Sequence, residues 1–274
     1  MNKLKIWKNT SALNSFTEDL YFTSIKKEAE VIILGSKSIN LSEFPNLKGI
    51  FRVGVGTENI PFDICKKRKI LLEFPSKKNL DILYEETSNY TIGLIFRMIY
   101  PSHNIQEQWI KFPRKVLNSQ TTLIIGTGNI GSRVAKKLKN FMKVKTFDIA
   151  KNNEKDLKGL IEEADIISIH IPGIIENENF FDQEKFKLMK KDSILINTSR
   201  AMLVEEKYLY ENLAKGKIRA AFDVFWKEPY RGRLVKFHPD PFFISPHIAS
   251  TSNEFFLGCA EDLKKLIYKI SNEK

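Results

Sequence analysis

The 274-residue sequence has few of the residues that build disulfides and metal sites, with two cysteines and four histidines. Cys65 and Cys259 cannot form a disulfide framework, and neither belongs to a C-x-x-C pair. Cys–His spacings typical of zinc sites do not occur, so we expect no metal centre. Because so little cysteine is typical of a reducing compartment, we expect a cytoplasmic protein.

Long apolar runs are missing as well. No stretch approaches the ~18 apolar residues of a membrane-spanning helix, and charges interrupt the first residues, MNKLKIWKNT. We therefore expect neither a membrane span nor a signal peptide. Internal repeats and low-complexity segments are also absent. With 42% hydrophobic and 28% charged residues the chain has the composition of a folded protein, and domains of roughly 100–200 residues predict two.

Acidic residues are outnumbered, 33 against 44 basic ones, which gives a net charge of +11. A basic surface attracts phosphate whatever the fold, so this charge by itself favours a nucleic-acid partner. The lysines are spread along the whole chain, however, and no basic run is interleaved with aromatic residues. We therefore do not expect nucleic-acid binding.

What the sequence contains is an alternation of short apolar runs with helical patterns, which is typical of parallel sheets with crossover helices. The expected strands include residues 30–36, 47–56, 69–74, 164–172, 193–199 and 219–225. Helices are expected at 85–99, 204–216 and 252–270, and a polar arm at 101–120. The last helix could return to pack on the first unit. The predicted domains are therefore 1–97 plus 252–274, and 98–251.

A glycine turn opens the second domain. In LIIGTGNIGSRVA, Gly126 permits a tight turn, Gly128 lets backbone approach a pyrophosphate, and Gly131 lets helix pack on strand. Asp148 ends the next strand, where a carboxylate accepts hydrogen bonds from ribose hydroxyls and repels a 2′-phosphate. This arrangement predicts NAD as the cofactor, and Lys151 three residues later leaves NADP open.

Three further polar residues follow apolar runs, and each has a structural explanation when taken alone. Arg200 follows a strand where α/β sheets bind ligands, but it could equally form a structural ion pair. Glu228 precedes a proline and could simply belong to a turn. His247 stands beside apolar residues, where histidines are more often packed than catalytic.

The order of these residues resembles the D-isomer-specific 2-hydroxyacid dehydrogenase family over nearly the whole chain. The matching motifs are GTGNIG, NTSRAMLVEE, AAFDVFWKEP and ISPHIAS, and FPNLKGIFRVGVGTENI resembles the substrate-domain loop of the family. The resemblance implies an α/β protein with a Rossmann-type, doubly wound parallel sheet for the cofactor. A smaller flavodoxin-like α/β domain would bind the substrate.

The resemblance also implies the roles of the site residues. Arg200 would bind the substrate carboxylate and 2-oxo oxygen, His247 would protonate that oxygen, and Glu228 would orient the imidazole. Asp223 would bind the nicotinamide carboxamide. The other implied cofactor contacts are Gly126, Gly128, Asn129, Ile130, Gly131, Asp148, His170, Pro172 and Thr198. Substrate contacts from the other domain would come from Arg52, Val53, Gly54 and Val55.

Several positions depart from the family pattern. Ala201 replaces a usual glycine, Glu58 and Pro61 stand where aspartates are frequent, and Ser88-Asn89 replaces an Ala-Glu pair. The arm at 101–120, which contributes to the dimer contact in the family, is short, although we still expect a homodimer.

Three functions stay open at this point. The chain could reduce a small 2-oxo acid, sense nucleotides as in the corepressor branch of the family, or oxidise formate or phosphite. The presence of Arg200, Glu228 and His247 together favours the first, a dehydrogenase that acts on a D-2-hydroxy acid. Glyoxylate, hydroxypyruvate or a phosphorylated acid would each serve as substrate.

Overall fold

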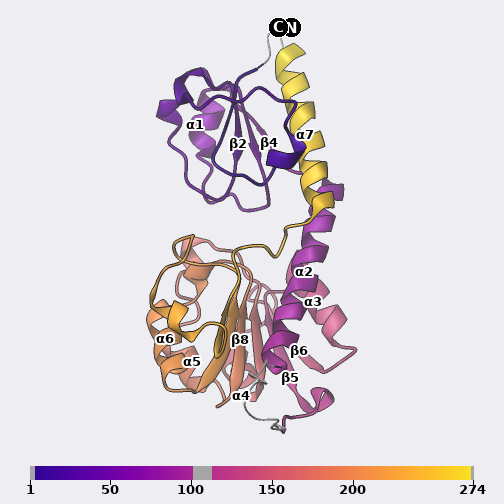
Figure 1. Ribbon diagram of the computed structural model, residues 1–274. Coiled ribbons are helices and arrows are strands. Elements are labelled where there is room, and N and C mark those ends of the chain that lie inside the picture. The colour runs from indigo at the N-terminus through magenta and orange to yellow at the C-terminus, as the bar shows by residue number, and fades with distance from the viewer. Residues whose placement is uncertain (1–3, 101–112, 273–274) are drawn as a thin grey trace, which may run out of the picture. The chain divides into compact units, whose positions relative to one another are not determined.

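The computed structural model describes residues 4–100 and 113–272, which form two compact units (Figure 1). One unit consists of the residues up to Leu83 together with those from Thr251, and the other runs from Tyr84 to Ser250. The first boundary falls within a long helix, whereas the sequence predicted it near residue 97. The substrate and cofactor roles of the two domains stay predictions.

The first unit is built on a parallel sheet in the order β1-β2-β3-β4. Its strands are β1 (Ile6–Lys8), β2 (Val31–Leu34), β3 (Gly49–Arg52) and β4 (Leu71–Glu73). Helix α1 (Phe62–Lys67) precedes β4, and the C-terminal helix α7 (Asn253–Asn272) packs against β3. Gly49 allows this contact, because a Cβ there would lie 2.5 Å from Cδ1 of Ile270.

Helix α2 (Lys77–Ile99) begins eight residues before the predicted helix at 85–99. Its first turn is polar, and its start is held by α7, where Asp262 accepts hydrogen bonds from the Ser76 amide and from Asn79 Nδ2. Gly258 of α7 lets the two helices approach, since a Cβ there would lie 2.2 Å from Asn79 Oδ1. The early start of the helix therefore depends on a contact between residues far apart in sequence, since Asn79 and Asp262 are separated by 183 residues.

The second unit contains a six-stranded parallel sheet in the order β10-β9-β8-β7-β5-β6. Its strands are β5 (Thr121–Ile125), β6 (Lys143–Phe147), β7 (Ile166–Ile169), β8 (Ser193–Asn197), β9 (Ile218–Phe222) and β10 (Phe242–Ile244). The strand order reverses between β5 and β7. Ligands of open α/β sheets bind at such a reversal, beyond the carboxyl ends of the strands.

Helices cover both faces of this sheet (Figure 1). Alternate strand residues point to opposite faces, so Ile124 and Ile196 join the core under α2 and α3 (Asn129–Leu138), while Leu123 and Leu195 join the core on the other side. That second core is completed by α4 (Glu154–Glu163), α5 (Gln183–Leu188) and α6 (Glu206–Ala214). Strands that are apolar on both faces explain the continuous hydrophobic runs of the sequence. The predicted fold class, two parallel α/β units, is confirmed.

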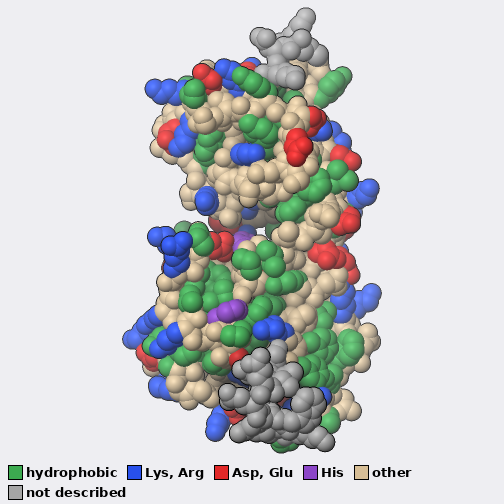
Figure 2. All heavy atoms as spheres, viewed as in Figure 1, with side chains coloured by type: hydrophobic (Ala, Val, Ile, Leu, Met, Phe, Trp, Pro, Cys, Tyr) green, Lys and Arg blue, Asp and Glu red, His purple; other side chains and the backbone are tan. Residues whose placement is uncertain are grey.

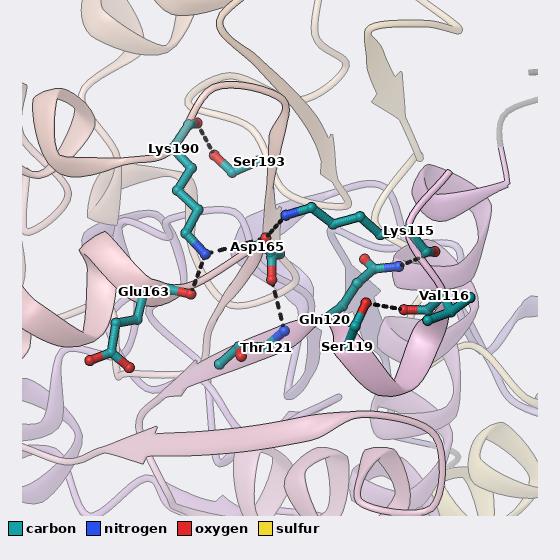
Figure 3. Close-up of polar contacts among 9 residues, drawn as sticks. All are labelled: Lys115, Val116, Ser119, Gln120, Thr121, Glu163, Asp165, Lys190 and Ser193. Carbon is teal, nitrogen blue, oxygen red and sulfur yellow. Dashed lines mark hydrogen bonds and ion pairs between the residues drawn. The ribbon is translucent and has the colours of Figure 1, made fainter. Parts of the chain in front are cut away.

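The amino end of this sheet is tied together by Asp165, the residue before β7 (Figure 3). Its carboxylate accepts the Thr121 amide at 2.9 Å and the ammonium groups of Lys115 at 2.8 Å and Lys190 at 3.3 Å. Burial would raise the pKa of Asp165, but these three contacts hold that pKa below its ordinary value. This cluster around Asp165 lies at the amino ends of the strands, opposite the end where ligands bind. We therefore assign it a structural role, which is to hold the start of β5 next to the start of β7.

Among the helices of the described residues, none combines the length and apolarity that crossing a bilayer requires. On the face drawn in Figure 2, Lys and Arg side chains lie scattered among acidic and apolar ones within each unit, and they do not gather into one patch.

Candidate functional site

The glycine turn lies at the carboxyl end of β5, where the strand order reverses. Gly126 has a φ of +94°, and a Cβ there would lie 2.6 Å from the carbonyl oxygen of His170 at the end of β7. A Cβ on Gly131 would lie 2.0 Å from the Gly126 carbonyl oxygen. Only glycine fits at these two places, because the turn, the helix and the neighbouring strand approach so closely.

The third glycine faces open space. Nothing lies within 4 Å of the position that a Cβ on Gly128 would take, and no side chain caps the helix that begins at Asn129. The first amides of a helix have no partner within the helix and attract anions. A phosphate group therefore fits here. Of the two predicted neighbours, Ile130 packs on the core below, and the Asn129 carbonyl accepts a hydrogen bond from Arg133.

Asp148 follows β6 and faces the glycine turn. Its Oδ2 accepts hydrogen bonds from the amide and the hydroxyl of Thr127, at 2.8 and 2.6 Å, and its Oδ1 accepts the Ala150 amide at 3.1 Å. These bonds, with the charge of Lys151, hold the pKa of Asp148 below its ordinary value. Lys151 Nζ donates to Thr127 Oγ1 at 2.9 Å, so a cation stands close to the ribose-binding carboxylate that the sequence predicted.

His170 stands at the end of β7, beside the glycine turn. Its Nε2 lies 2.8 Å from the hydroxyl of the buried Ser168. Burial lowers the pKa of His170 to about 4, so the ring is neutral near neutral pH. Two residues later the Pro172 carbonyl accepts from Asn177, at 2.9 Å.

Asp223 follows β9 and is fully buried. Its Oδ1 accepts the Ser245 hydroxyl and the Ile248 amide, the latter at 2.9 Å, and its Oδ2 accepts the Ala249 amide at 2.9 Å. The carboxylate therefore fixes the segment 245–249, which the sequence singled out for its histidine. Its predicted contact with a carboxamide stays a prediction.

His247 and Glu228 are in direct contact. Imidazole Nδ1 lies 2.9 and 3.0 Å from the two carboxylate oxygens of Glu228. Burial would raise the pKa of Glu228, but His247, the Phe225 amide and the charge of Arg200 together hold that pKa below its ordinary value. The side chain of His247 remains 36% exposed, so the ring is paired on one nitrogen and accessible to solvent.

Arg200 follows β8, close enough to Glu228 for its charge to act on that carboxylate. One guanidinium nitrogen donates to the Ser199 carbonyl at 2.8 Å. A Cβ on Gly173 would lie 2.3 Å from Cγ of Arg200, so the glycine makes room for the arginine. Thr198 is buried, and its hydroxyl lies 2.9 Å from that of Thr91 on α2. The unit thus gathers Arg200, Glu228 and His247 beyond the carboxyl ends of its strands.

The four predicted substrate residues belong to the other unit, in the loop after β3. Arg52 is 5% exposed, and its guanidinium donates to the carbonyls of Gly56, at 2.9 Å, and of Val53. The Val53 amide donates to the Leu34 carbonyl at 2.9 Å. Gly54 has a φ of +119°, which favours glycine. Arg52 therefore braces this loop from within, and Val55 is exposed at its surface.

The sequence motifs missed two polar residues of the second unit, Tyr90 and Ser245, whose hydroxyl oxygens lie 2.6 Å apart. Ser245 stands two residues before His247, which was the only available signal. Within the described residues, no group of three or more His, Cys, Asp or Glu side chains could hold a metal ion.

Comparison with known proteins agrees with this geometry. Residues 92–249 match the family described as "D-isomer specific 2-hydroxyacid dehydrogenase, NAD binding domain". The chain is 34% identical to a glyoxylate reductase of Thermofilum pendens, over 77% of this chain and 68% of that protein. It is 29% identical to a D-3-phosphoglycerate dehydrogenase of Methanocaldococcus jannaschii, over 88% of this chain and half of that protein.

A solved structure extends the likeness. The crystal structure of a D-lactate dehydrogenase from Aquifex aeolicus, complexed with NAD and lactic acid, has a TM-score of 0.81 and 26% identity, covering 97% of this chain and 95% of that one. The fold and the glycine turn thus define an NAD-dependent oxidoreductase. The chain belongs to the D-isomer specific 2-hydroxyacid dehydrogenase family.

Proposed function

We propose that this protein interconverts a small 2-oxo acid and the corresponding D-2-hydroxy acid, with His247 as the proton donor and acceptor. The observation that carries the proposal is the contact of His247 Nδ1 with both oxygens of Glu228, beside Arg200. A carboxylate in contact with one ring nitrogen selects the tautomer of the imidazole. The outer nitrogen, Nε2, is then the one that exchanges a proton with substrate.

The division of labour follows from the charges. When bound, the nicotinamide ring supplies or accepts the hydride. As the 2-oxo oxygen gains electrons, His247 gives it a proton, and in the opposite direction His247 removes the hydroxyl proton. Arg200 has a planar fork of donors that matches a carboxylate, so we assign it the carboxylate and the oxo oxygen of the substrate.

The first unit would complete the binding of the substrate carboxylate through the loop after β3. We assign this role to the amides of Gly54 and Val55, since the amide of Val53 already donates to Leu34. Arg52 would keep the loop in shape, because its guanidinium donates to the carbonyls of Val53 and Gly56. This use of Arg52 favours a small acid such as glyoxylate or hydroxypyruvate over a phosphorylated one.

The cofactor contacts we propose come from the glycine turn, where the amides at the start of α3 would bind the pyrophosphate and Asp148 the ribose hydroxyls. Asn129, Ile130, His170, Pro172, Thr198 and Asp223 would line the remainder. NAD is the proposed preference because Asp148 repels a 2′-phosphate, and NADP is a weaker alternative because Lys151 lies beside it.

The test is a panel of 2-oxo acids with NADH or NADPH, followed at the absorbance of the reduced nicotinamide. We expect turnover of glyoxylate or hydroxypyruvate with NADH, and a loss of about a hundredfold or more in His247→Ala, the range typical of a general acid. Undiminished turnover in His247→Ala would contradict its role as the proton donor. Tight NADH binding without turnover of any acid would favour a nucleotide sensor instead.

A further inference from the structure

The side chains that hold the segment around His247 extend beyond the residues with proposed catalytic roles. Ser245 Oγ donates to Asp223 Oδ1, and the Tyr90 hydroxyl on α2 lies 2.6 Å from Ser245 Oγ. Asp223 is fully buried and Ser245 is 1% exposed. A chain of hydrogen bonds shielded from water therefore joins α2 to the loop that carries His247.

The direction of this chain follows from counting protons. An ionised carboxylate only accepts, so the one hydroxyl proton of Ser245 is used on Asp223. Tyr90 must then donate to Ser245. Burial raises the pKa of the Tyr90 phenol, so its proton is present at any pH where the protein works. The donors therefore run from Tyr90 through Ser245 to Asp223.

At its far end the chain fixes backbone. Asp223 accepts the amides of Ile248 and Ala249, both at 2.9 Å, and these are the two residues that directly follow His247. The φ of His247 is +56°, in the left-handed region that histidine seldom occupies. Such a conformation persists only where the surroundings hold it. The orientation of the Asp223 carboxylate thus helps to set where the imidazole stands.

We infer that Tyr90 is a positioning residue for the acid–base step, keeping His247 aligned with Glu228 through Ser245 and Asp223. The inference rests on the proposed function. The next residue of α2 makes a similar link, since the hydroxyl of Thr91 donates to the Thr87 carbonyl and therefore accepts from Thr198, two residues before Arg200. One turn of α2 thus supports the strand ends that present both Arg200 and His247.

Tyr90→Phe tests this role because it removes only the hydroxyl. We expect kcat to fall about fivefold, the equivalent of one ordinary hydrogen bond, with the KM for NADH unchanged. Ser245→Ala should produce the same changes, and the double variant should lose no more than either single one.

Thr122→Val is the matched control. Thr122 lies in β5 of the same sheet and is also fully buried, and its hydroxyl donates to Met142 Sδ, 2.8 Å away. It should lose a similar amount of stability and keep the native kcat. A second measurement is amide hydrogen exchange at Ile248 and Ala249, which should become about fivefold faster in Tyr90→Phe and stay unchanged in Thr122→Val.

An unchanged kcat with unchanged exchange in Tyr90→Phe would overturn the inference, as would additive losses in the double variant. Exchange does not depend on turnover, so it separates this inference from the proposed function. If the native protein reduces no 2-oxo acid, the proposed catalysis fails, while faster exchange in Tyr90→Phe would still establish the link from α2 to the histidine segment.

Discussion

At the scale of single residues, two carboxylates on one connection after β9 hold the histidine in different ways. Asp223 accepts the backbone amides that follow His247, and Glu228 contacts the imidazole itself. The first is buried and the second is partly exposed. Asp223 therefore controls the backbone position of the histidine and Glu228 the orientation of its ring. Substitutions at the two carboxylates can test these two roles one at a time.

Glu228→Gln should lower kcat for the 2-oxo acid by about tenfold to a hundredfold, because the neutral amide no longer presents two carboxylate oxygens to Nδ1 and so fixes the imidazole tautomer less firmly. Steady-state rates measure the loss. Glu163→Gln is the control, as this glutamate pairs with Lys145 at the surface. A Glu228→Gln enzyme with the native kcat would exclude the proposed pairing.

We expect the folding stability of the protein to fall in acid because of His170. Its folded-state pKa of about 4 lies below the 6.5 of the unfolded chain, so the unfolded state binds more protons between these values. Stability must therefore fall as pH drops from 6.5 toward 4, by about 2 kcal/mol between pH 7 and pH 5 from this group. His170→Gln should flatten that dependence. Urea unfolding of both proteins at the two pH values provides the comparison, and parallel curves would refute the assignment.

The sequence motifs identified Asp223, Glu228 and His247 because their order along the chain resembles the pattern of the family. They did not identify Tyr90, since a tyrosine on an apolar helix is usually a packing residue. Its significance depends on a hydroxyl partner 155 residues away, which no local pattern contains. For Arg52 the sequence pointed to the loop in which it lies. It did not predict that the guanidinium would donate to the carbonyls of that same loop, at Val53 and Gly56.

At the scale of elements, apolar runs located most of the strands to within a few residues. The expected strands at 164–172, 193–199 and 219–225 correspond to β7, β8 and β9. Strand β1 was missed, because it has only three residues and ends at a lysine. The start of α2 was also missed, since Asp262 of α7 caps it from a distant part of the chain. The local pattern of apolar residues thus predicts those helices and strands that are stabilised by burying their own side chains.

The glycine turn gives a matched set of substitutions at this scale. Gly131→Ala should cost about 1–3 kcal/mol of folding stability, because its Cβ would meet the Gly126 carbonyl at 2.0 Å. Gly128→Ala has open space and should fold normally, yet it should weaken NADH binding by standing where the phosphates approach.

Gly93→Ala is the control for those two variants, since a Cβ at Gly93 also meets open space. Gly93 lies within α2, where alanine should raise the folding stability by up to about 1 kcal/mol. Thermal unfolding and NADH titration separate the three cases. Unweakened NADH binding by Gly128→Ala would argue against the assigned phosphate site.

At the scale of the whole molecule, the predicted arm at 101–120 is the segment expected to contribute to a dimer. Its residues 101–112 lie outside the described part of the chain. We nevertheless expect a homodimer, with a mass in light scattering of about twice the 31.8 kDa of the chain. Shortening the arm should shift the protein toward the monomer, and a monomeric native protein would contradict the expected homodimer.

The first unit is assembled from both ends of the described chain, and this has a consequence for its biosynthesis. Residues up to Leu83 leave the ribosome well before α7, which packs on β3. The continuous stretch from Tyr84 to Ser250 can acquire its core while translation proceeds, since domains generally fold as units. Strand β3 therefore stays uncovered at Gly49 until α7 emerges from the ribosome. The strands before Leu83 are thus the part of the nascent chain most exposed to aggregation, until α7 has been made.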